Sequence, residues 1–185
     1  MSNYLSKLVI GTAAWGSIPY GMNQNCPSWR EKKAIMELAA DHGLHDYHVK
    51  PEYDAIIPLK CTRHIEYGVY TLAECDLNAK RLLVPYNPFK QWVVDGLGDY
   101  RGSLWVYSIF MQGKLLNESG GYKTCVDLAF GNPWIDNVVV GINSVSELNE
   151  LIYAIKSINT NHLFVKGLIQ CKGPCDETDP RTWEH

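Results

Sequence analysis

Val138-Val139-Val140-Gly141-Ile142-Asn143-Ser144-Val145-Ser146-Glu147-Leu148 predicts a buried strand that leads directly into a helix. Three consecutive β-branched apolar residues without alternation are typical of a strand covered on both faces, as in a parallel sheet or a barrel wall. Gly141 permits a tight turn, Asn143 or Ser144 can act as the N-cap, and Glu147 completes a capping box with Ser144. The free amides at such a helix start can bind a phosphate, although a plain strand–helix connection fits the same pattern.

Strands and helices alternate along the rest of the chain. The expected strands are Leu8–Gly11, Leu44–Val49, His64–Tyr70, Leu82–Asn87, Leu104–Phe110 and the run that begins at Val138. The expected helices run from the capping box Ser28–Glu31 to about His42, from Thr71 onward, around Thr124–Phe130, and from Ser144 to about Ile158. A loop is expected between Pro51 and Pro58, and the state of Leu163–Val165 stays open. Alternation of this kind predicts a parallel α/β fold, here a single domain over residues 1–185.

Composition narrows the class of protein and its partners. The chain has 185 residues, of which 46% are hydrophobic and 20% charged, as expected for one globular domain. Its net charge of −3 provides no dominant basic surface, so we expect neither a nucleic-acid nor a membrane partner. No apolar run reaches membrane-spanning length, and residues 1–7 lack the pattern of a secretory signal, which predicts a cytoplasmic location.

Cysteines and histidines give no recognised metal motif. The six cysteines have no paired C-x-x-C spacing and are expected to be free thiols. Cys171 and Cys175 lie close together, but they are separated by a Gly-Pro pair and have no second pair to complete a site. His42, His45 and His48 straddle a helix end and a strand start, so they need not converge. We therefore expect no metal.

A set of short motifs, in order along the chain, resembles the landmarks of the aldo/keto reductase family. These motifs are Val9–Ala13 with Trp15-Gly16, Pro51-Glu52-Tyr53, Val84–Asn87, Ser108–Leu115, Val139–Ser144 and Asp179-Pro180-Arg181-Thr182-Trp183. The resemblance implies a (β/α)8 barrel with its active site at the carboxyl ends of the strands. It also implies reduction of a small-molecule carbonyl substrate by a nicotinamide cofactor, NADP or NAD.

The chain is short for such a barrel, which normally takes about 250 residues. After Tyr53 only residues 54–63 precede His64–Tyr70, which resembles the fifth strand of the family. The sequence therefore predicts a TIM-barrel-like parallel fold with about two βα units missing. In the family, those units would carry the catalytic lysine and histidine.

Tyr53, His48 and Lys60 are the main candidates for the catalytic site, and His64 is a further candidate. Tyr53 matches the tyrosine that donates a proton to the carbonyl oxygen in the family, and His48 falls where the family has an aspartate. Lys60 is a candidate substitute for the missing lysine, and His64 for the missing histidine. The alternative is that Tyr53, Lys60 and His64 are ordinary loop and strand-end residues.

The resemblance assigns the cofactor to two loops that follow the last two strands. Its candidate contacts are Ser108, Phe110, Gly113, Leu115, Gly141, Asn143 and Ser144. Four other positions depart from the family, which has Ser, Gln, Gln and Asn where this chain has Gly68, Leu83, Glu147 and Leu151. Lost amide contacts cost about 0.5–1.5 kcal/mol each, and Glu147 would repel a phosphate.

Removal of strands from a closed barrel leaves two unpaired edges. Two chains could pair through these edges, and a homodimer is the expected assembly; the alternative is closure into a smaller barrel. Three functions remain open. They are an NAD(P)H-dependent carbonyl reductase with a degenerate site, a catalytically inactive barrel remnant that serves as a binding or assembly module, and a protein that binds a small molecule or an anion through the phosphate loop alone.

Overall fold

The computed structural model describes residues 4–16, 26–49, 57, 60–65, 67–98, 100–117 and 120–158. Tyr53, the segment Leu163–Val165, Cys171, Cys175 and the motif Asp179–Trp183 lie outside these ranges. The four described cysteines, Cys26, Cys61, Cys75 and Cys125, are free thiols. None of the described helices combines the length and the apolar character needed to cross a membrane.

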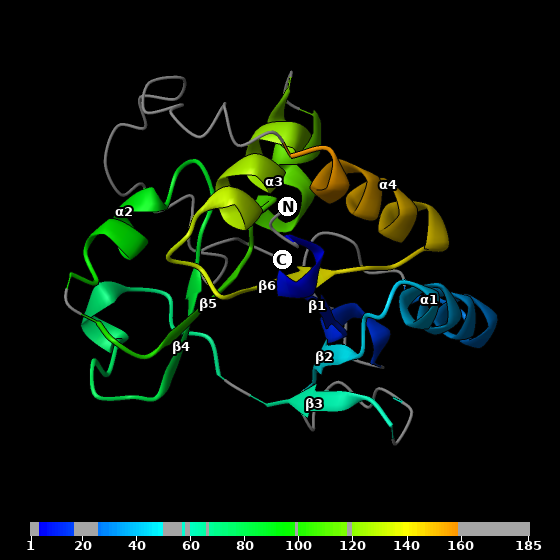
Figure 1. The fold of residues 1–185 in the computed structure, drawn as a ribbon, viewed down its shortest axis with the longest axis horizontal. Coiled ribbons are helices and arrows are strands. Elements are labelled where there is room, and N and C mark those ends of the chain that lie inside the picture. The colour runs from blue at the N-terminus through cyan, green and yellow to red at the C-terminus, as the bar shows by residue number, and fades with distance from the viewer. Residues whose placement is uncertain are drawn as a thin grey trace.

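Six parallel strands form one curled, half-barrel sheet (Figure 1). They are β1 (Leu8–Gly11), β2 (Asp46–His48), β3 (Thr62–His64), β4 (Arg81–Pro85), β5 (Ser103–Tyr107) and β6 (Asn137–Gly141). Their order across the sheet is β3-β2-β1-β6-β5-β4, so the first and last strands of the chain pair at the centre. The predicted parallel α/β fold is confirmed. Within the described residues, β3 and β4 form the two edges of the sheet.

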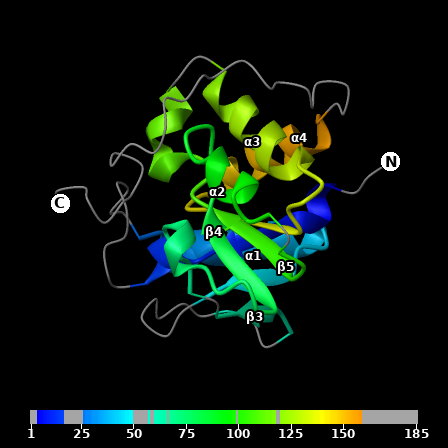
Figure 2. The same cartoon turned by 90° about the vertical axis from the view of Figure 1, so that its left-hand side faces the viewer.

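Four helices lie along the convex side of the curl (Figures 1 and 2). They are α1 (Trp29–Asp41), α2 (Gln91–Asp95), α3 (Gly121–Gly131) and α4 (Val145–Lys156), and short 3-10 turns occur at η1 (Tyr4–Lys7), η2 (Ala13–Trp15), η4 (Leu72–Glu74) and η5 (Met111–Asn117). The predicted helices over α1, α3 and α4 are confirmed within a few residues. The helix expected from Thr71 is only the turn η4, and α2 was not predicted.

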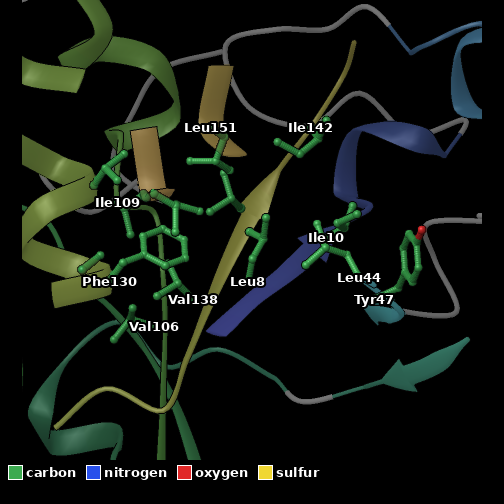
Figure 3. Close-up of a cluster of buried hydrophobic side chains, with 14 of the residues drawn as sticks. Leu8, Ile10, Leu44, Tyr47, Val106, Ile109, Phe130, Val138, Ile142 and Leu151 are labelled. Carbon is green, nitrogen blue, oxygen red and sulfur yellow. The ribbon is translucent and has the colours of Figure 1, made fainter. Parts of the chain in front are cut away.

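Strands β1, β4, β5 and β6 bury residues on both of their faces, which explains the unbroken apolar runs in the sequence, whereas β3 at the edge of the sheet is largely exposed. Outward-facing residues such as Leu8, Val106 and Val138 pack with Phe130 of α3 and Leu151 of α4 in the main core (Figure 3). A second, smaller cluster consists of Val9, Leu83, Trp105 and Val139. These residues alternate with the outward-facing ones along their strands, so the cluster fills the concave side of the sheet.

Polar and aromatic side chains connect the two sides of the curl. His64 Nε2 on β3 lies 2.8 Å from Asp46 Oδ1 on β2, and the His64 ring meets the Trp105 ring of β5 edge-on at 4.5 Å. The Arg81 guanidinium of β4 lies 4.2 Å from the centroid of the same Trp105 ring. Strands at opposite edges of the sheet therefore contact one another through side chains rather than through a hydrogen-bonded ladder.

The strand predicted over His64–Tyr70 is the main error in the sequence analysis. Among the described residues of this stretch, the strand is Thr62–His64, and it pairs with β2. Residues 67–70 run on beside β4, where Val69 N donates to Leu83 O at 2.9 Å. A segment this short has too few residues to establish a periodicity, so its pairing partner could not be identified from the pattern.

Both predicted capping interactions at Ser28 and Ser144 are present. Ser28 Oγ accepts from Glu31 N at 3.2 Å at the start of α1, and Ser144 Oγ accepts from Glu147 N at 3.1 Å at the start of α4. Glu147 Oε2 in turn accepts from Asn143 N at 2.7 Å. Glu31 does not complete a box on its own helix. Its Oε1 instead accepts from Val145 N at 2.7 Å, which connects α1 to the first turn of α4.

Truncation of Phe130 tests the main core. This side chain is fully buried between the sheet and the helices, so we expect Phe130→Ala to lower the free energy of unfolding by about 3–5 kcal/mol. Tyr153→Ala is the matched control, because Tyr153 of α4 is 78% exposed and its loss should change stability by no more than about 0.5 kcal/mol. Urea unfolding measures both. Equal losses in the two variants would contradict this packing.

Removal of Glu31 tests the connection between α1 and α4. We expect Glu31→Ala to cost about 1–3 kcal/mol in unfolding free energy, because the Val145 amide loses its charged acceptor. Glu37→Ala is the control, since the Glu37 side chain is 66% exposed and only forms a surface ion pair with Lys33 at 3.6 Å. A loss in Glu31→Ala no larger than in the control would show that this hydrogen bond does not stabilise the fold.

Candidate functional site

A cavity of about 520 Å³ opens at the carboxyl ends of the strands. Residues from β1, β2, β5 and β6, and from the segments that follow them, line it, among them Gly11, His48, Ser108 and Gly141. Parallel strands bring their carboxyl ends to the same side of a sheet, which is where α/β proteins bind their ligands. The volume lies within the range of small-molecule pockets, which is about 300–1,000 Å³.

Hydrogen bonds between neighbouring loops hold this end of the sheet together. The His48 carbonyl accepts from Thr12 N at 3.2 Å and from Thr12 Oγ1 at 3.1 Å, so the segment after β1 is fixed to the end of β2. Trp15 Nε1 donates to Ile142 O at 2.6 Å, which fixes the turn η2 to the loop after β6. The cavity is therefore built on connected and partly buried backbone.

Tyrosines form much of the cavity wall. Tyr107, at the end of β5, donates through its hydroxyl to Val69 O at 2.9 Å and meets the Tyr70 ring edge-on at 6.0 Å. Gly68 permits this arrangement, because a Cβ at that position would lie 2.9 Å from Tyr107 Cε1. Tyr122 stacks on Phe110, with ring centroids 5.1 Å apart and an angle of 6° between the planes. The wall thus presents flat apolar faces beside a few hydroxyl groups.

The loop after β5 has an unusual backbone. Ser108, Met111 and Gln112 have positive φ angles of 57°, 48° and 54°, and Gly113 follows with 98°. Such backbone is costly for side chains other than glycine and is concentrated at functional sites. Two amides of the loop are used internally, since Met111 N donates to Ser108 O and Gly113 N donates to Phe110 O, both at 3.0 Å.

Acidic groups of the chain itself occupy the start of α4. The amides of Asn143 and Val145 donate to the carboxylates of Glu147 and Glu31, and the Glu147 amide donates to Ser144 Oγ. A helix N-terminus attracts anions through these same amides and its dipole. Here two carboxylates already accept from these amides. A phosphate would have to displace them against electrostatic repulsion.

The carboxylates of the cavity lining are not balanced by a lysine or an arginine among the described lining residues. Glu147 and Glu150 are exposed at the rim of the cavity. Burial raises the pKa of the Tyr122 phenol to about 12, and the nearby charges of Glu150 and Glu147 act in the same direction. The Tyr122 phenol is therefore protonated at neutral pH and can donate a hydrogen bond, with two carboxylates nearby.

Among the candidate catalytic residues, the structure describes His48, Lys60 and His64. His48 is buried at the end of β2 and lines the cavity. Lys60 is exposed at a turn before β3 and is not among the described lining residues, and Tyr53 lies outside the described ranges. His64, the candidate substitute for the missing histidine, contacts Asp46 and Trp105 inside the curl. Of the three described candidates, His48 lines the cavity, and Lys60 and His64 are not among its described lining residues.

The predicted cofactor residues divide into two groups. Most of them line the cavity together, namely Ser108, Phe110, Gly113, Gly141 and Asn143. Leu115 is buried instead in a cluster with Met111 and Cys125, and the Ser144 hydroxyl caps α4. Two segments that are about 30 residues apart in the chain thus meet at one site.

The lining residues that sequence reasoning missed include Tyr70, Tyr107, Tyr122 and Glu150. The sequence could have indicated Tyr107, because this residue is two positions after the inward-facing Trp105 and directly before Ser108. The sequence could also have indicated Glu150, since it lies three residues after Glu147 on the same helix face. No pattern in the sequence indicates Tyr122. Within the ranges that the structure describes, no group of three or more His, Cys, Asp or Glu side chains is placed to hold a metal ion.

Comparison with known proteins adds no relative. No family model, no curated protein and no solved structure matches this chain.

Proposed function

We propose that this protein is a shortened aldo/keto reductase-like barrel, with about two βα units missing, that binds a small molecule without phosphate groups in its strand-end cavity. One observation carries the proposal. The ends of β1, β2, β5 and β6 and the loops after β1, β5 and β6 converge on a cavity with stacked aromatic side chains in its wall, at the end of the sheet where barrels of this kind bind their ligands.

The described residues do not fit the phosphates of a nicotinamide dinucleotide. Pyrophosphate is normally bound by free backbone amides, a helix N-terminus or basic side chains. In this chain several of the loop amides donate to internal acceptors, carboxylates cap α4, and Glu147 and Glu150 stand at the rim. A compact aromatic ligand without phosphates meets none of these obstacles.

NAD(P)H-dependent reduction of a small carbonyl compound is the second candidate. The observation that favours it is that the candidate catalytic residue His48 and the candidate cofactor residues Ser108, Gly113 and Gly141 line one cavity. In that case Tyr53 is the proton donor, and basic residues from outside the described ranges would have to bind the phosphates. The two candidates differ in one measurable property, which is affinity for the cofactor.

The homodimer expected from the sequence stays a prediction. Its basis is the pair of sheet edges at β3 and β4, with Ile65 and Tyr67 in the segment between them 53% and 67% exposed.

A side chain added at Gly141 should close the cavity without disturbing the fold. Gly141 lines the cavity, and a Cβ built there meets no atom within 4 Å. We expect Gly141→Leu to weaken the binding of benzyl alcohol by at least about tenfold, which corresponds to about 1.4 kcal/mol, as measured by saturation-transfer NMR. Tyr153→Leu, on an exposed part of α4, is the control and should bind like the unaltered protein. Unchanged binding in Gly141→Leu would place the ligand elsewhere.

Titration with NADPH and NADH separates the two candidates. Because the described lining is acidic and lacks lysine and arginine, we expect no saturable quenching of tryptophan fluorescence below about 1 mM cofactor, a limit of about 4 kcal/mol in binding free energy. Saturation in the micromolar range would overturn the first candidate in favour of the reductase. Tyr53→Phe would then be compared with the unaltered protein on a panel of small aldehydes.

A further inference from the structure

We infer that the ligand of the strand-end cavity is an organic cation, an ammonium group attached to a flat apolar ring. This inference deepens the proposed function and rests on it, because it takes the cavity as a small-molecule site. The inference also holds if the protein is an NAD(P)H-dependent reductase. In that case the carbonyl substrate would itself carry the ammonium group.

The first support is the arrangement of negative charge. Glu147 and Glu150 are one turn apart on α4, and both line the cavity. Both are close enough to Tyr122 to act on its phenol electrostatically, so the charge lies beside the aromatic wall. No described lysine or arginine of the lining offsets it. A cation in the cavity would therefore be attracted from the rim.

The second support is a hydrogen-bond acceptor without a donor. Asn143 lines the cavity, and its Oδ1 atom is buried and finds no hydrogen-bond partner among the described residues. A buried acceptor left without a donor costs free energy, which a ligand N–H group would recover. An ammonium ion has only donors, so it matches this acceptor and the two carboxylates together.

The third support is the aromatic surface. The stacked pair of Phe110 and Tyr122 and the edge-on pair of Tyr70 and Tyr107 supply ring faces on the cavity wall. Such faces attract cations and also pack against a flat ring. Charge, hydrogen-bond acceptors and aromatic faces thus favour the same class of ligand.

Three ligands that share one ring test the inference. Benzylamine, benzyl alcohol and benzoate differ mainly in charge, so their affinities for the full chain at neutral pH compare a cation, a neutral molecule and an anion. We expect benzylamine to bind at least about tenfold more tightly than benzyl alcohol and benzoate to bind least, with the preference for the amine decreasing as salt is added.

The double variant Glu147→Gln with Glu150→Gln locates the charge that causes this preference. Glutamine keeps an oxygen that can accept from the Asn143 amide, so α4 stays capped while both charges are removed. We expect its affinity for benzylamine to decrease to that for benzyl alcohol, with the alcohol itself unaffected. Glu37→Gln on α1 is the matched control and should retain the full preference, because Glu37 is an exposed residue away from the cavity.

The results that would overturn the inference are of two kinds, which can be told apart. Equal binding of benzylamine and benzyl alcohol to the unaltered protein, or a preference that survives in the double variant, would refute the cationic ligand and leave the small-molecule site intact. Failure of all three ligands to bind would refute both the inference and the proposed function. Circular dichroism and thermal unfolding of each variant confirm that the fold is retained.

Discussion

The pairing of β1 with β6 is the constraint on which the rest of the structure depends. It places Val9 beside Val139 and Gly11 beside Gly141, so the first and last strands of the described chain lie together at the centre of the sheet. Every other strand adds outward from this pair, and the helices then cover the convex side. Because all the strands are parallel, their carboxyl ends lie on one side, and the cavity is a direct result of that topology.

Side chains connect the two edges of the curled half-barrel sheet. A closed barrel has no free edges, whereas a sheet of six strands exposes two. Here Asp46, His64, Arg81 and Trp105 meet on the concave side, and residues 67–70 lie along the outer edge of β4. These contacts keep the sheet curled, and the curl is what gives the cavity its depth.

The start of α4 is stabilised by acceptors from within the chain. A capping box stabilises a helix with the same amides that would otherwise bind an anion. With Glu147 and Glu31 as the acceptors, the helix is stabilised internally, and its positive dipole end is already neutralised. The aromatic side chains and the Asn143 oxygen, which has no hydrogen-bond partner among the described residues, belong to the same cavity lining.

The sequence by itself determined the strongly patterned elements, because their signals are local. The apolar run of β6, the N-caps at Ser28 and Ser144, and the buried run of β4 follow from periodicity and capping chemistry. The convergence of Ser108, Gly113 and Gly141 was expected from the resemblance alone, and the cavity brings these residues together. Only the tertiary structure decided that β3 pairs with β2, that Glu31 caps a different helix, and that three tyrosines and Glu150 join the site. These features depend on contacts between residues far apart in the chain, and such contacts leave no periodic pattern in the sequence.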